Sequence, residues 1–152
     1  MKLSEILTPK RVNLDLKGRT KAEILEELVK LLRLRAPSRE NLLKTLRARE
    51  ELGSTGLGKG IAIPHCRSLV VSETQIAVGR SGRGVSFQSM DRKRAHLFFL
   101  IVAPPMGDPG DYLIALGAVA QMAKRIAKDK RFKSINQPGR FIRLIKELED
   151  ES

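Results

Sequence analysis

The sequence predicts an α/β fold: a single domain whose mixed β-sheet of about five strands carries helices on both faces. A nearly continuous apolar run, HLFFLIVAP at 96–104, is typical of a central strand that is buried on both faces. Segments with helical spacing of apolar residues alternate with short β-like segments on either side of this run. No repeat, low-complexity tract or linker divides the 152 residues, so one domain is expected over 1–152.

The first half of the chain contains one predicted strand and two predicted helices. VNLDL at 12–16 alternates as a short strand does. Thr20 and Glu23 form a capping box at the start of an apolar-periodic helix. Its apolar face consists of Ile24, Leu25, Leu28, Leu31 and Leu32. A second helix, with Ser38 as its expected cap, ends near Gly53.

The second half contains two further short strands and three predicted helices. The β-like segments are IAIP at 61–64 and TQIAVGR at 74–80. After the buried run, helical spacing predicts a long helix over 111–128 and a short one over 129–135. Pro138 stands where a last helix would begin, because proline suits the first helical turn.

The composition describes a basic protein without features of secretion or membrane insertion. Lys plus Arg number 29 against 17 acidic residues, a net charge of +12, but the basic residues are scattered apart from RKR at 92–94. Aromatic residues make up 4% and Trp is absent, so base stacking is poorly supplied and a nucleic-acid partner is not expected. No apolar run approaches a membrane span, and the N-terminus lacks the apolar block of a signal peptide. A single cysteine, Cys66, excludes an internal disulfide, and a cytoplasmic location is expected.

The glycine-rich stretch ELGSTGLGKGIAIPHCRS at 51–68 resembles a nucleotide-binding P-loop only superficially. Gly53 and Gly58-Lys59 have P-loop spacing, but Gly60 stands where the Mg²⁺-binding Ser or Thr belongs. A helix precedes the glycines and a strand follows them, the reverse of the P-loop order. No helix N-terminus would therefore point at the phosphates, and we exclude a nucleotide site.

The same stretch predicts a site for an oxyanion beside a histidine. Ser54 and Thr55 offer hydroxyl groups, glycines leave backbone N–H groups accessible, and Arg49 lies just upstream. Pro64 fixes the backbone that leads into His65. The competing interpretations are a flexible connector, an ordinary loop histidine and a solvated arginine.

No catalytic or metal-binding role is expected for Cys66 or for the second histidine, His96. Cys66 and His65 are adjacent in an extended segment, so their side chains point to opposite sides and do not form a catalytic pair. No C-x-x-C or H-x-x-H spacing indicates a metal site. His96 begins the buried strand and is expected to be structural, while Arg67 can either reach the site or be exposed.

RE-x-LGSTGLGKGIAIPH at 49–65 resembles the signature of type-2 enzyme IIA domains of the bacterial phosphoenolpyruvate-dependent phosphotransferase system, the fructose/mannitol class. The opening LSEILTPKRVNLDLKGRTKAEILEELVKLL is similar to the nitrogen-regulatory branch of that class. The resemblance implies a phosphoryl carrier in which His65 accepts a phosphoryl group from the histidine phosphocarrier protein. The phosphoryl group is then passed to an enzyme IIB, or the phosphorylation state regulates partner proteins. No metal or organic cofactor is implied.

The resemblance also implies the roles of the other site residues. Arg49 would stabilise the phosphoryl oxygens with its planar fork, and Ser54, Thr55 and the amide of Gly56 would donate further hydrogen bonds. Many type-2 domains carry a second active-site histidine where this chain has Tyr112, within PGDYLIALGAVAQMAK. A phenol can hydrogen-bond a phosphate oxygen but cannot become a cation. The alternative hypothesis is therefore a non-catalytic regulatory interaction module that has lost efficient phosphotransfer.

Overall fold

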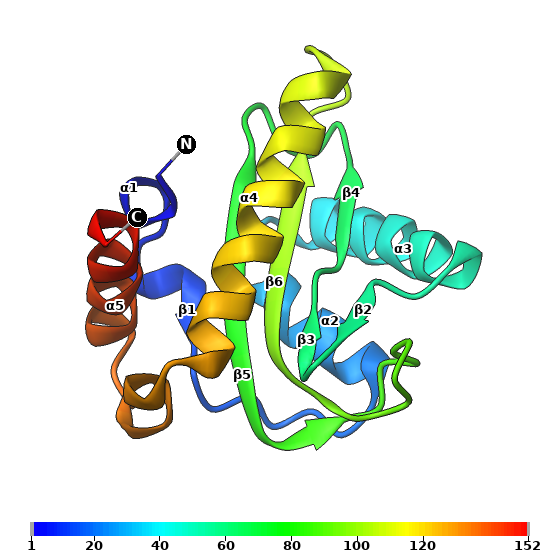
Figure 1. Cartoon of the computed structure of the whole chain (residues 1–152). Helices are drawn as coiled ribbons and strands as arrows, with labels where there is room; N and C mark the ends of the chain where they lie inside the picture. The colour runs from blue at the N-terminus through cyan, green and yellow to red at the C-terminus, as the bar shows by residue number, and fades with distance from the viewer. Residues whose placement is uncertain (1, 152) are drawn as a thin grey trace.

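The computed structural model describes residues 2–151 and contains one mixed sheet with helices on both faces, which confirms the predicted fold class (Figure 1). The strand order is β1-β5-β6-β3-β2, and β4 also pairs with β6. β5 and β6 are antiparallel, whereas β3 and β4 both run parallel to β6. The strands are β1 Val12–Asn13, β2 Gly56–Gly58, β3 Ile61–Ala62, β4 His65–Arg67, β5 Gln75–Val85 and β6 Ala95–Ala103.

Two apolar clusters cover the two faces of the sheet. On one face, Phe98 and Leu100 of β6 pack with α2 and α3. On the other face, Phe99 and Ile101 of β6 pack with α4 and α5. Successive residues of β6 thus alternate between the clusters, and the prediction of a strand buried on both faces is confirmed. The helical segments are α1 Leu3–Ile6, η1 Pro9–Arg11, α2 Lys21–Lys30, α3 Ala36–Leu52, α4 Pro109–Lys128, η2 Lys130–Ser134 and α5 Pro138–Asp150.

The predicted helices are all present, with two differences at their N-termini. The capping box of Thr20 and Glu23 at the start of α2 is confirmed. The expected cap of α3 was wrong: the helix begins at Ala36, before Ser38, because Pro37 in the first turn needs no hydrogen-bond partner for its nitrogen. α4 begins at Pro109 rather than 111, with the Asp108 carboxylate accepting from the Gly110 amide at 2.8 Å.

The strands differ more from the prediction than the helices do. β1 is limited to Val12–Asn13, because the Asn13 side chain accepts from the Asp15 amide and turns the chain out of the ladder. The expected strand at 61–64 ends at Ala62, since Pro64 has no N–H to donate, and pairing resumes in β4 at His65. β2, β4, α1 and η1 were not expected, and β5 continues to Val85, beyond the predicted end at residue 80. Within residues 2–151, no helix is long and apolar enough to cross a bilayer.

Candidate functional site

β4 places His65 on the face of the sheet that α4 covers. His65 lies opposite Ile101 of β6, and the Ile101 amide donates to the Pro64 carbonyl at 3.0 Å. The next residue, Cys66, belongs to the apolar cluster on the other face. His65 and Arg67 therefore point to the α4 side, as the alternation of an extended segment predicts. The side chain of His65 is partly exposed.

A single hydrogen bond decides which nitrogen of His65 is nucleophilic. Nδ1 lies 2.7 Å from the carbonyl oxygen of Ile63. Because a carbonyl oxygen can only accept, Nδ1 carries the proton and Nε2 keeps its lone pair. The backbone thus fixes both the tautomer and the orientation of the ring.

Tyr112, in the first turn of α4, is the aromatic neighbour of His65. The two ring centroids lie 6.2 Å apart with an interplanar angle of 59°. The Tyr112 hydroxyl is buried and has no hydrogen-bond partner within residues 2–151. Burial raises the pKa of Tyr112 to about 12, with a smaller rise from Cys66, while the charges of Arg67 and Arg49 oppose the rise. The phenol is therefore a neutral hydrogen-bond donor at physiological pH.

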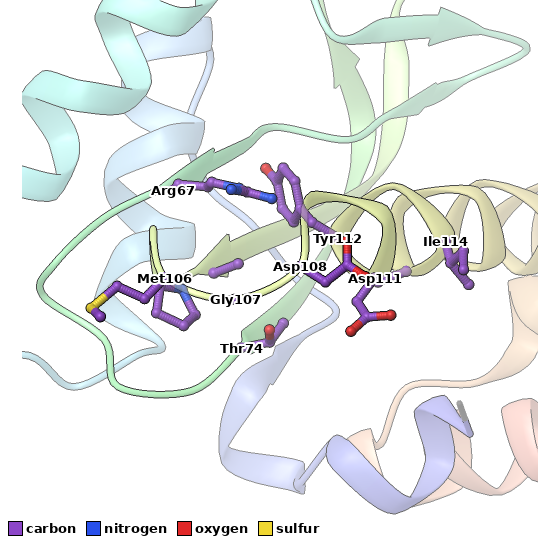
Figure 2. A pocket seen from close by; sticks show the side chains of 11 residues that line it. Arg67, Thr74, Met106, Gly107, Asp108, Asp111, Tyr112 and Ile114 are labelled. Carbon is purple, nitrogen blue, oxygen red and sulfur yellow. The ribbon is translucent and has the colours of Figure 1, made fainter.

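Arg67 reaches the site, which the sequence left open. Its guanidinium carbon lies 4.7 Å from the centroid of the Tyr112 ring, a cation–π arrangement. Figure 2 shows the Arg67 side chain extended toward this ring. Both residues line a cavity of about 420 Å³, together with Thr74, Met106 and Asp108 among others (Figure 2). A permanent positive charge thus lies beside Tyr112, the residue that the resemblance places where many type-2 domains carry a second histidine.

Arg49 lies at the C-terminal end of α3. Its Nη1 donates to the Gly53 carbonyl at 2.9 Å, one of the carbonyl groups that the helix leaves without an internal partner. Its charge lies close enough to lower the pKa of Tyr112. The structure therefore brings His65, Tyr112 and Arg67 together, with the charge of Arg49 near enough to act on Tyr112.

The other three predicted site residues make their bonds within the protein. The Ser54 hydroxyl donates to the Phe87 carbonyl and accepts from the Gly56 amide at 3.0 Å. Thr55 is buried, and its hydroxyl donates to the Glu50 carboxylate at 2.6 Å. At Gly56, any Cβ would meet the Ser89 hydroxyl at 2.4 Å, so glycine is required there for packing. Direct phosphate contacts from Ser54, Thr55 and Gly56 stay predictions.

Glu50 is a buried partner of the glycine-rich loop to which the sequence analysis assigned no role. It is 7% exposed, and its carboxylate accepts from both the amide (3.0 Å) and the hydroxyl of Thr55. Lys21 of α2 completes the group, with Nζ 3.4 Å from the carboxylate. In the sequence, Glu50 stands among other charged residues and looks solvated. No local pattern in the sequence indicates its pairing with Thr55, because the burial of its carboxylate depends on tertiary packing.

Cys66 and His96 lie outside this chemistry. Burial raises the pKa of the Cys66 thiol to about 11, so the thiol stays protonated. His96 Nδ1 lies 2.9 Å from the Ser81 carbonyl, and its ring lies over Gly84. Within residues 2–151, no group of three or more His, Cys, Asp or Glu side chains could hold a metal ion.

Comparison with known proteins gives a consistent family. Residues 5–148 match the family described as phosphoenolpyruvate-dependent sugar phosphotransferase system, EIIA 2. A nitrogen regulatory protein of Pseudomonas aeruginosa is 33% identical over 136 residues, 88% of each chain. The fructose-specific EIIABC component of Bacillus subtilis is 35% identical over 127 residues, which are 82% of this chain but only 20% of that protein. The crystal structure of nitrogen regulatory protein IIA-Ntr from Neisseria meningitidis superposes with a TM-score of 0.79 at 29% identity, over 94% of this chain and 98% of that one. With nearly the whole chain matched and the fold shared, this protein belongs to the type-2 EIIA family of the phosphotransferase system.

Proposed function

We propose that the protein is a cytoplasmic phosphoryl carrier that accepts a phosphoryl group on Nε2 of His65 from a histidine phosphocarrier protein. The observation that carries the proposal is the hydrogen bond from Nδ1 to the Ile63 carbonyl, which leaves Nε2 as the nucleophilic nitrogen. The lone pair of Nε2 attacks phosphorus as the phosphorus–nitrogen bond of the donor breaks, and that bond's electron pair stays on the donor imidazole. The proton stays on Nδ1 and is donated to the Ile63 carbonyl, and this hydrogen bond stabilises the positive charge of the phosphorylated ring.

The surrounding cations and the phenol suit the transition state. Phosphoryl transfer passes through a loose transition state in which negative charge is spread over three equatorial oxygens. In our proposal, Arg67 and Arg49 stabilise that negative charge, and the unpartnered Tyr112 hydroxyl donates a hydrogen bond to one of the oxygens. Tyr112 cannot become a cation as a histidine does, but Arg67 on its ring supplies that charge. In this mechanism Ser54, Thr55 and Gly56 act by holding the loop in place.

The output that we propose is regulation of partner proteins rather than sugar uptake. The supporting observation is that the Pseudomonas nitrogen regulatory protein matches along 88% of both chains, whereas the Bacillus fructose component matches over a fifth of its own length. Transfer to an enzyme IIB is the other outcome of the same chemistry. Either one begins with phosphorylation of His65.

The test is phosphorylation in a reconstituted system. The protein is incubated with phosphoenolpyruvate, enzyme I and the phosphocarrier protein, and its mass is measured. We expect the gain of one phosphoryl group, labile in acid as phosphohistidine is, in the wild type and in His96→Gln. His65→Gln should gain none. A folded wild-type protein that gains no mass with a competent donor would contradict the proposal and favour the non-catalytic regulatory module.

A further inference from the structure

A basic surface lies at the end of the sheet opposite the phosphoryl site. It consists of Lys59, Arg83, Arg92, Lys93 and Arg94, here called the basic loop surface. All five residues are exposed. Lys59 lies on the turn before β3, Arg83 near the end of β5, and the other three on the segment that joins β5 to β6. Figure 1 shows this end of β6 far from the start of α4.

The register of β6 separates the two sites. Ala95 begins β6 beside the basic loop surface, whereas His65 lies opposite Ile101. Six residues of strand at about 3.3 Å each place the two sites roughly 20 Å apart. A molecule bound at the basic loop surface would therefore leave His65 accessible to a phosphoryl donor.

The five cations of the basic loop surface outnumber the acidic side chain among them, Asp91. None of its five side chains forms an ion pair within residues 2–151. The nearby carboxylate of Asp91 accepts instead from two backbone amides, of Lys59 at 2.9 Å and of Lys93 at 3.0 Å. Arg94 Nη1 donates to the Arg83 carbonyl at 3.3 Å. These bonds hold the cations on an ordered loop, with their charge directed to solvent.

Two of these cations stand where glycine would fit the backbone better. Lys59 has φ of 57° and Arg92 has φ of 61°, both in the left-handed region. Side chains raise the energy of that conformation, and glycine adopts it freely. Among residues 2–151, neither side chain forms a hydrogen bond or an ion pair, so the strained backbone at these exposed positions points to a role outside the fold.

An exposed apolar residue in the same segment favours a protein partner over a nucleic acid. Met90, next to Asp91, is 89% exposed, and methionine is common at the centre of protein interfaces. Phe87, the single aromatic residue between β5 and β6, is fully buried and cannot stack on a base. We propose that the basic loop surface docks an acidic segment of a partner protein, with Met90 as its apolar anchor.

Binding of labelled peptides tests the proposal without any phosphorylation step. The probe is a short fluorescent peptide of Glu, Asp and Leu, and its Gln, Asn and Leu counterpart is the control. Replacing Arg92, Lys93 and Arg94 together by Gln should weaken binding about tenfold or more. The matched variant removes the same charge from α5, at the exposed residues Arg140, Arg143 and Lys146, and should lose less than about twofold. Equal losses in the two variants would overturn the proposal, because net charge alone would then explain binding.

Two further measurements separate the remaining alternatives. Met90→Ala should weaken binding of the acidic peptide, and tighter, loop-dependent binding of single-stranded DNA would overturn the choice of partner. Arg92→Gly should weaken peptide binding while leaving the Tm unchanged or raising it by up to about 4 °C, because the backbone strain is relieved. Unchanged peptide affinity in Arg92→Gly would show that Arg92 does not contribute to binding and would contradict its place in the basic loop surface. Every loop variant should still be phosphorylated on His65, so failure here is distinct from failure of the proposed function.

Discussion

Tyr112→Phe should stabilise the unphosphorylated protein and slow its phosphorylation. The hydroxyl is buried without a partner, and an unsatisfied buried polar group costs about 1 to 3 kcal/mol. Phenylalanine keeps the ring under Arg67 and removes that cost, so we expect the free energy of unfolding to rise by ~1 kcal/mol. In a chain of 152 residues this corresponds to a Tm increase of about 2 to 4 °C.

The same substitution removes a donor from the transition state. A hydrogen bond to a charged group contributes about 1.5 to 3 kcal/mol. Its loss from the transition state should therefore lower the rate of transfer to His65 by roughly 10-fold to 100-fold. The assay is rapid-quench transfer from the phosphorylated phosphocarrier protein, with the Tm measured on the same samples. A variant that is more stable and also slower is difficult to explain by a general loss of structure.

Ser89→Ala is the matched control. Ser89 Oγ and the Tyr112 hydroxyl are the two buried side-chain polar atoms without a partner among residues 2–151, and Ser89 lies on the segment that precedes β6. Its removal should raise the Tm similarly and leave the transfer rate unchanged. If Tyr112→Phe changes the rate by less than about twofold, or Ser89→Ala slows it equally, the role assigned to the Tyr112 hydroxyl is refuted.

Three further predictions concern the groups around the site. Tyr112 is the single tyrosine and Trp is absent, so the absorbance of ionised tyrosine reports on this residue alone. In the folded protein this absorbance should rise with a midpoint near the pKa of about 12, and a midpoint near 10 would contradict the burial of Tyr112. Because this folded pKa lies above the ordinary value of 10, ionisation of the phenol favours the unfolded state. The free energy of unfolding should therefore be unaffected by this group below pH 10 and should fall as the pH rises toward 12. Glu50→Ala should lower the free energy of unfolding by about 2 kcal/mol in chemical denaturation, because Lys21 and Thr55 lose their partner, and it should also slow phosphorylation. As a control, replacement of the exposed Glu51 by Ala should change the free energy of unfolding by less than ~0.5 kcal/mol. The Cys66 thiol, with its pKa raised to about 11 by burial, should react with a disulfide reagent only on unfolding, and rapid labelling of the native protein would show that it is accessible.

The parts of the fold that rest on local chemistry were predictable from the sequence. The run at 96–104 could be assigned to a buried central strand because its apolar residues continue on both faces, and β6 confirms it. The capping box of Thr20 and Glu23 needs contacts only within one turn, so its sequence determines it. The short strands β1 and β2 were predicted poorly, because two or three residues carry almost no periodicity and depend on their neighbours in the sheet.

The candidate site shows the same division between local and distant contacts. His65 could be selected as a candidate because Pro64, the glycines and Arg49 are close to it in sequence, and its role as phosphoryl acceptor stays a prediction. The partners of Ser54 and Thr55 could not, because the Phe87 carbonyl that accepts from Ser54 is 33 residues away and the Glu50 carboxylate is buried only by the packing of α2 and α3. A hydroxyl group next to glycines indicates a hydrogen bond but not its acceptor, and here folding directs both hydroxyls into the protein.

The surroundings of Tyr112 also depend on contacts between residues far apart in the sequence. Taken alone, tyrosine in the place of a second histidine indicates weakened phosphotransfer, because a phenol has no cationic form at physiological pH. Arg67 is 45 positions earlier in the chain, and only the packing of α4 against β4 and β6 brings its guanidinium to 4.7 Å from the tyrosine ring. In the proposed mechanism, Arg67 supplies the charge and Tyr112 the hydrogen-bond donor that one histidine would combine. Arg67→Gln should therefore slow phosphorylation about tenfold, with partial recovery in Arg67→Lys. A wild-type rate in Arg67→Gln would mean that the charge of Arg49 alone is sufficient.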